Sequence, residues 1–271
     1  MDAEWLAFEL GQKPAIRRTV DPADAARVEA QLRSGGAVVL RAAQTAVLGG
    51  REQVVLYAAR SAGHAGALRD AEEAVLPGRA SAGDAAARHR AIGSLLGFPP
   101  CCVEAFLERL DRGVDRLDRG GPGGFAEDYV AARGAWVPRA DARINPLLMA
   151  ARAQLISFYP CRYDCPVAVG VAEALRAALA ARQPTTARSL LALLSHPVAV
   201  AADGARALLS LDDDRALIAR AAAPRRRDGA SDPRDAALAA RLAGLRVDAV
   251  GAIVAGGSDP AAPPWCVDFG G

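Results

Sequence analysis

Four of the five cysteines of this chain stand in two close pairs, and each pair lies beside proline. The adjacent residues Cys101 and Cys102 follow two prolines, while Cys161 and Cys165 are separated by three residues and precede Pro166. Proline is favoured at the first position of a helix, where its missing N–H would have no intrahelical partner. The pattern therefore predicts that both pairs lie at the amino termini of helices.

Helix amino termini favour thiolate, which is the form of cysteine that binds metal. The unpaired N–H groups of a first turn and the positive end of the helix dipole both stabilise negative charge. Two helices that direct their first turns at one point would hold an anionic metal–thiolate centre. We therefore expect one metal centre with the ligands Cys101, Cys102, Cys161 and Cys165.

The spacing of these ligands leaves the identity of the metal open. Neighbouring side chains diverge along a regular helix, which strains joint ligation of one small ion by Cys101 and Cys102. The two thiolates would reach separate corners of a [4Fe–4S] cluster where the backbone is irregular, as we expect it to be just after the two prolines. Cys161 and Cys165 have a spacing typical of zinc ligands, so structural zinc is the first alternative. A metal-free dithiol site is the second, and four buried thiols that act as small apolar side chains are the third.

The sequence around both pairs resembles a known family. Residues 96–106 resemble a Leu-Gly-Tyr-Pro-x-Cys-Cys-Val-x-x-Phe signature of a prokaryotic family of uncharacterised proteins, and residues 158–165 look like its later Pro-Cys-x-x-x-Cys element. Phe98 stands where tyrosine is usual, which removes a phenol and keeps the ring. The similarity covers residues 89–175 and implies that the four cysteines act together, while the family brings no established reaction with it.

Five further residues are candidates for a role at the centre. Arg162, Tyr163 and Asp164 stand inside the second cysteine loop, where they would contact a substrate or donate hydrogen bonds to thiolate sulfur. Glu104 follows the first pair, where a carboxylate complements the helix dipole. His89 lies one predicted helix earlier, and we consider it as a ligand, as a general base or as a solvated helix residue.

The apolar pattern predicts an α+β protein whose helical central core carries the cysteines. The core covers residues 84–182, lies between α+β regions at 1–83 and 183–271, and forms one compact unit with them. We expect helices from Pro22, at 103–110, from Asn145 to before Pro160, and at 166–182, 190–194 and 235–242, with strands at 37–40 and 53–58, a hairpin at 198–211 and a strand at 247–254.

Composition limits the classes of binding partner and the cellular compartment that we expect for this chain. The 33 basic and 31 acidic residues give a net charge of +2, so no overall field draws this chain to nucleic acid or to an anionic membrane. It has no run of about 18 apolar residues that would span a bilayer, and its acidic amino terminus is unlike a secretory signal. We therefore expect a cytoplasmic protein.

The function that these observations favour is that of a [4Fe–4S] protein. Its cluster would act on a small-molecule substrate, or would exchange electrons or sulfur with a redox partner protein. The alternatives are a structural zinc-binding interaction module and a dithiol redox protein. The fifth thiol, Cys266, has no partner nearby in the sequence, and we expect it to be incidental or buried.

Overall fold

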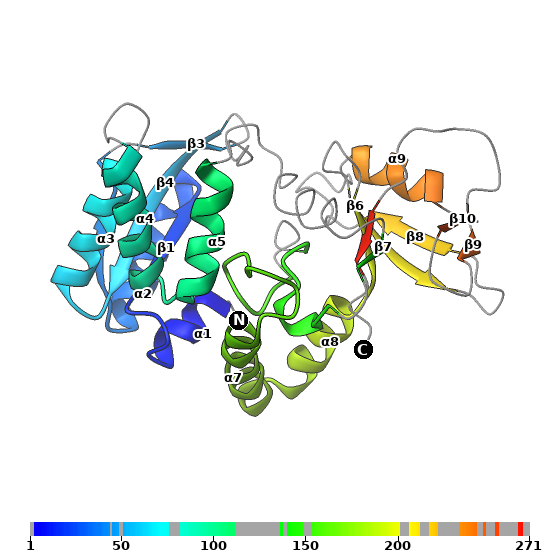
Figure 1. The fold of residues 1–271 in the computed structure, drawn as a ribbon. Coiled ribbons are helices and arrows are strands. Elements are labelled where there is room, and N and C mark those ends of the chain that lie inside the picture. Colours follow the sequence, from blue (N-terminus) through cyan, green and yellow to red (C-terminus); the bar gives the residue numbers. More distant parts are fainter. Residues whose placement is uncertain are drawn as a thin grey trace. The chain divides into compact units, whose positions relative to one another are not determined.

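The structure is a computed structural model. It describes residues 3–43, 45–48, 51–75, 82–111, 136–137, 140–148, 153–200, 206–211, 217–221, 233–242, 246–247, 253–254 and 265–267 (Figure 1). The chain divides into two compact units, Met1–Arg112 and Gly113–Gly271, and the boundaries expected after residues 83 and 182 fall inside them. Both units combine helices with a sheet, which confirms the α+β class.

The first unit is built on a small antiparallel sheet with the strand order β1-β4-β2. The long strand β4 pairs with both β1 and β2, and its amino-terminal half also pairs with β3. The elements are α1 (Ala3–Glu9), β1 (Ala15–Val20), η1 (Pro22–Asp24), α2 (Ala25–Ser34), β2 (Val38–Arg41), β3 (Ala46–Leu48), β4 (Arg51–Ala59), α3 (Ala62–Ala74), α4 (Ala82–Leu95) and α5 (Pro100–Asp111).

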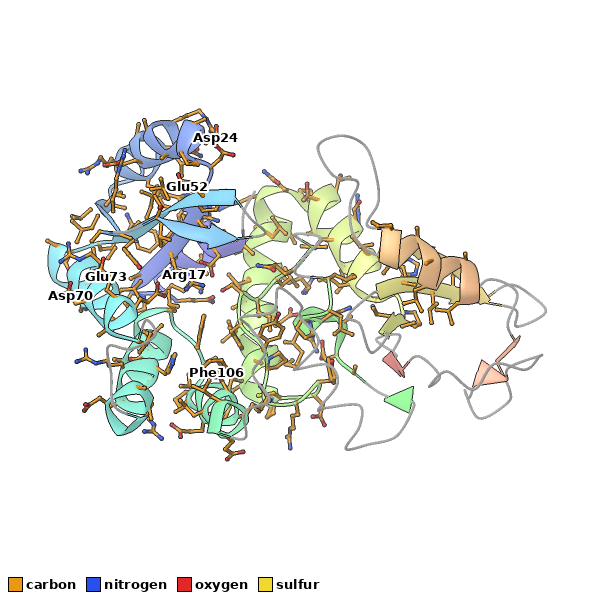
Figure 2. All side chains as sticks on the ribbon, turned by 90° about the horizontal axis from the view of Figure 1, so that it is seen from above. Arg17, Asp24, Glu52, Asp70, Glu73 and Phe106 are labelled. Carbon is orange, nitrogen blue, oxygen red and sulfur yellow. The ribbon has the colours of Figure 1, made fainter. Side chains whose placement is uncertain are left out.

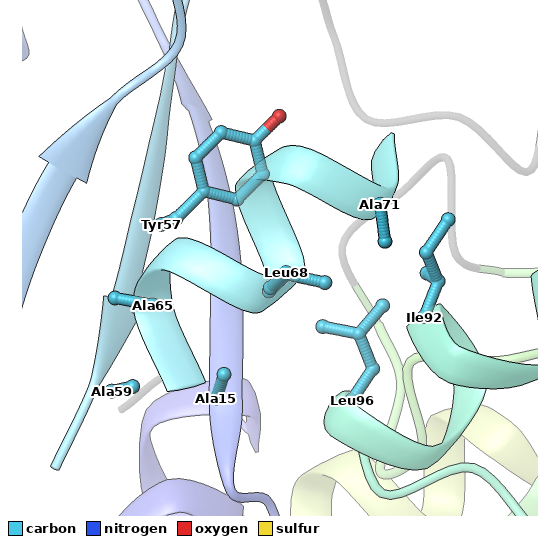
Figure 3. Close-up of a cluster of buried hydrophobic side chains, with 8 residues drawn as sticks. All are labelled: Ala15, Tyr57, Ala59, Ala65, Leu68, Ala71, Ile92 and Leu96. Carbon is cyan, nitrogen blue, oxygen red and sulfur yellow. The ribbon is translucent and has the colours of Figure 1, made fainter. Parts of the chain in front are cut away.

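Helices cover both faces of this sheet. Successive side chains of β4 point to opposite faces, and the side chains on each face belong to a separate apolar cluster. Tyr57 and Ala59 belong to a cluster that includes Leu68 of α3 and residues at the end of α4 (Figure 3). Leu56 and Ala58 belong to the other cluster, together with residues of α1 and α2. The unit is therefore a three-layer sandwich that carries α5 beside α4.

The second unit contains a five-stranded sheet with the order β5-β11-β6-β7-β8. All neighbours in this sheet are antiparallel except β5 and β11, and α9 packs against β7 and β8. The elements are β5 (Trp136–Val137), η3 (Ala142–Ile144), α7 (Pro166–Arg182), α8 (Pro184–Leu194), β6 (Val198–Val200), β7 (Arg206–Leu211), β8 (Leu217–Ala221), α9 (Pro233–Leu242), β9 (Arg246–Val247), β10 (Ile253–Val254) and β11 (Trp265–Val267).

The expected helix that starts at Asn145 is wrong, since residues 145–148 and 153–160 are not helical. The Asn145 side chain accepts a hydrogen bond from Leu147 N at 2.9 Å and donates one to Leu194 O at 2.8 Å, at the end of α8. It therefore fixes a turn and closes another helix instead of starting its own. Leu147 and Leu155 are buried, so their apolar spacing reflects burial in an irregular segment.

The strand expected at 247–254 is also wrong. Two short strands, β9 and β10, occupy its ends and pair with each other in antiparallel fashion. The expected hairpin at 198–211 is confirmed by the pairing of β6 with β7, and its turn lies outside the described residues. Among the helices that the structure describes, none combines the length and the apolar character needed to cross a bilayer.

Candidate metal centre

The structure brings together the four cysteines that the sequence singled out. The Sγ atoms of Cys101, Cys102, Cys161 and Cys165 all lie within 4.8 Å of one another, and we call these residues the cysteine cluster. Cys102 and Cys165 are buried, Cys161 is half-buried and Cys101 is exposed. Thiolate sulfur is a preferred ligand of zinc and of iron in iron–sulfur centres, so the cluster could hold a metal.

The first pair follows a tight corner between α4 and α5, formed by residues 96–100. Phe98 N donates to Gly93 O at 2.8 Å and Gly97 N donates to Ser94 O at 3.1 Å, which is the hydrogen-bond pattern of a Schellman cap. Gly97 has a φ of +69°, a conformation that favours glycine. A Cβ atom on Gly97 would also collide with the carbonyl oxygen of Gln12, so any other residue at this position would strain the structure.

Helix α5 begins at Pro100, as the sequence predicts, and places both thiols in its first turn. The N–H groups of Cys102 and Val103 donate to Pro99 O at 2.9 and 3.1 Å. The two sulfur atoms of the pair lie 3.9 Å apart. The expectation of an irregular backbone at the pair is therefore wrong, because adjacent cysteines approach each other within a helical turn.

Helix α5 is held against α4 by close packing and by a surface ion pair. Gly93 leaves room for Val103, whose side chain would collide with any Cβ at that position. Arg90 donates to both carboxylate oxygens of Glu104, at 2.7 and 2.8 Å, and these hydrogen bonds lower the pKa of Glu104. Both side chains are about half exposed, so the pair orients α5 more than it stabilises it.

His89 does not join the cysteine cluster. Its ring makes an edge-to-face contact with Phe106 of α5, with ring centroids 5.3 Å apart. Burial lowers the pKa of His89, because the charged form loses hydration. Of the roles considered for His89, a ligand to the cysteine cluster is not supported, because the ring instead makes an apolar contact with Phe106, which Figure 2 labels on α5.

The second pair flanks a turn that leads into α7. Cys165 N donates to Arg162 O at 3.2 Å, and Cys165 O accepts from Val169 N at 2.9 Å, so Cys165 caps the helix that begins at Pro166. The prediction of a helix amino terminus is confirmed for this cysteine. Cys161 stands just before the turn, outside the helix.

The three residues inside this turn divide between the interior and the surface. Tyr163 is almost fully buried, at 1% exposed, and its carbonyl oxygen accepts from Asp141 N at 2.8 Å. Arg162 and Asp164 form an exposed ion pair with each other at 3.0 Å. Tyr163 therefore anchors the turn, while the charges of its two neighbours partly neutralise each other at the surface.

An ion-pair network fixes the segment to which Tyr163 is anchored. Arg143 donates to Asp141 at 2.6 Å and to Glu173 of α7 at 3.1 Å, and Arg176 also donates to Glu173. The hydrogen bonds from Arg176 and Arg143 lower the pKa of Glu173 to about 2. No local sequence pattern indicates this anchor, because Asp141 and Glu173 are far apart in the chain and share no motif.

No family model, curated protein or solved structure matches this chain. The resemblance of residues 89–175 to a prokaryotic family therefore stays a prediction. Cys266 lies in β11, where its backbone pairs with Ala199 of β6.

Proposed function

We propose that the cysteine cluster binds one tetrahedral metal ion, most suitably zinc, and that this ion serves as a structural clamp. The observation that carries the proposal is the separation of the sulfur atoms. A zinc ion with Zn–S bonds of about 2.3 Å places its four sulfurs about 3.8 Å from one another. Cys101 and Cys102 have a separation of 3.9 Å, and no pair in the cluster exceeds 4.8 Å.

The ligand set also supports a structural role for the ion. Four thiolates fill all positions of a tetrahedral ion, which is typical of closed structural zinc sites, whereas catalytic zinc keeps one position open. One ion would close the long loop between Cys102 and Cys161. Since the unfolded chain has no preformed site, the binding free energy would add to the free energy of unfolding.

A [4Fe–4S] cluster is the second candidate, and the exposure of Cys101 favours it. An exposed ligand would open one side of a cluster to a small-molecule substrate or to a redox partner protein. Each iron of a cubane occupies its own corner, so its thiolates lie further apart than those around a single ion. The two cysteine pairs would have to spread from the observed separations to hold such a cluster.

Metal and sulfide analysis of the purified protein separates the two candidates. The chain should be purified once in air and once under anaerobic conditions, and assayed for zinc, iron and acid-labile sulfide. Stoichiometric zinc without sulfide in both preparations is the expected result. Iron and sulfide in equal amounts, with visible charge-transfer absorbance, would contradict the zinc clamp and favour a [4Fe–4S] cluster.

A further inference from the structure

Lys13 is the single lysine among the 33 basic residues of the chain, and it is buried. Only 6% of its surface is exposed, and its Nζ lies 2.6 Å from Glu4 Oε1. Burying an ammonium group costs free energy unless it is paired, so a buried lysine needs compensating contacts. Glu4 supplies one of these contacts, and burial nevertheless lowers the pKa of Lys13.

The second contact of this ammonium group is the ring of Phe98. Nζ lies 4.8 Å from the ring centroid, within the range of a cation–π interaction. Phe98 is part of the corner between α4 and α5, three residues before Cys101. The buried charge therefore acts directly on the segment that leads into the cysteine pair.

The backbone beside Lys13 contacts the same corner. A Cβ on Gly97 would collide with Gln12 O and would lie 3.1 Å from Lys13 Cγ, so residues 12–13 pack closely against Gly97. The corner is thus held at two consecutive residues, through the backbone at Gly97 and through the ring at Phe98. Neither contact belongs to α4 or α5 itself.

The position of the corner determines the position of the two thiols, because the segment between them is stiff. Pro99 and Pro100 fix two φ angles, so few rotations separate Phe98 from Cys101. Pro99 O also accepts hydrogen bonds from the N–H groups of Cys102 and Val103. A shift of Phe98 would therefore move the first turn of α5 and both of its sulfur atoms.

We propose that Lys13 is a positioning residue for the metal centre, which holds Phe98 and thereby sets the direction of the Cys101 and Cys102 thiolates. This inference rests on the proposed function. A lysine that only stabilised the fold would affect the free energy of unfolding and leave the coordination of a bound metal unchanged. The test must therefore measure the metal site itself.

The test compares full-length Lys13→Met with wild type and with Arg60→Met. Methionine keeps an unbranched apolar stem and removes the charge. Arg60 is a matched control in the same compact unit, because its guanidinium also lies over an aromatic ring, 4.4 Å from the centroid of Phe8. The contacts recorded for Arg60 are with Phe8 and with Gly35 O, and neither residue is part of the corner at 96–100. Zinc affinity would be measured by chelator competition, and the coordination by the visible spectrum of the Co²⁺-loaded protein.

Lys13→Met should weaken zinc binding by about 10- to 100-fold, the usual effect of losing a residue that orients a ligand, and should alter the Co²⁺ spectrum. Arg60→Met should leave both unchanged. An unchanged affinity and spectrum in Lys13→Met would overturn the inference, even if that variant unfolds more easily. If Lys13→Met does not fold, Phe98→Leu removes the ring and keeps the Lys13–Glu4 pair, and the same outcomes apply.

Hydrogen exchange separates a failure of this inference from a failure of the metal proposal. If wild type binds no metal, exchange at the amides of Cys102 and Val103 still reports how firmly the corner is held, since both donate to Pro99 O. These amides should exchange faster in Lys13→Met than in wild type or in Arg60→Met. Equal exchange rates in all three proteins would show that Lys13 does not position the pair.

Discussion

At the scale of single residues, Gly97 connects backbone conformation with the position of the first cysteine pair. Its φ of +69° costs an alanine about 1–2 kcal/mol, and the collision of a Cβ with Gln12 O adds to this cost. Gly97→Ala should therefore destabilise the metal-free protein by more than about 1 kcal/mol, as measured by urea unfolding.

Gly170→Ala is the matched control for this substitution. Gly170 lies inside α7, and a Cβ there meets no atom within 4 Å. Alanine is favoured over glycine inside a helix by about 0.5–1 kcal/mol, so Gly170→Ala should be neutral or stabilising. Equal changes in the two variants would contradict the role assigned to the corner.

His89 should make the packing of α4 against α5 sensitive to acid. Burial lowers the pKa of His89 in the folded state below its ordinary value of 6.5, so protonation favours the unfolded state. The stability that neutral His89 contributes is fully present above pH 6.5 and is lost as the pH falls through the lower, folded-state pKa.

We expect His89→Gln to remove this part of the pH dependence. The free energy of unfolding would be measured between pH 7.5 and pH 5. The metal-free protein is used because protonation of the thiolates would release a bound metal in the same pH range. Wild type should lose stability relative to the variant as the pH falls. Parallel pH profiles would mean that His89 titrates alike in the folded and unfolded states.

At the scale of elements, the contact between Gly93 and Val103 sets how closely α4 and α5 approach. Gly93→Ala overfills this contact and should cost about 1–3 kcal/mol of stability. Adding Val103→Ala removes the colliding side chain, so the double variant should recover part of the loss even though Val103→Ala alone is destabilising. Strictly additive losses in this double-mutant cycle would indicate that the two residues do not meet.

Local signals in the sequence predicted the elements that carry the cysteines. Pro100 and Pro166 start α5 and α7 because proline suits a first helical position. Gly97 closes the preceding helix because its positive φ favours glycine. The helix expected from Asn145 failed because the same asparagine can cap a helix or fix a turn. The distant hydrogen bond to Leu194 O decides between these outcomes, and no local pattern contains it.

The same limit applies to the residues that support the site. The cysteine pairs were visible in the sequence because spacing and proline mark them. Lys13 and Asp141 were not visible, since each acts on a segment that is remote in the chain, at Phe98 and at Tyr163. Strand β1 was also missed, because three polar residues follow one another at positions 17–19 and the strand shows no alternation of apolar and polar residues.

At the scale of the whole molecule, a metal clamp makes stability depend on free zinc. Binding to the folded state alone adds about 4 kcal/mol when the free zinc concentration is a thousand times Kd. Adding a strong chelator should therefore lower the melting temperature, and restoring zinc should raise it again. A melting temperature that is the same with chelator and with zinc would contradict a structural role for the ion.

The central claim is that four cysteines together hold one metal, and the metal content of single Cys→Ser variants tests it most directly. Separate replacement of Cys101, Cys102, Cys161 and Cys165 should each lower the metal bound per chain, because each change removes one of four thiolates. Cys266→Ser should keep the wild-type content, since the sequence places this thiol outside both pairs. Full retention of metal in both Cys161→Ser and Cys165→Ser would contradict the shared site.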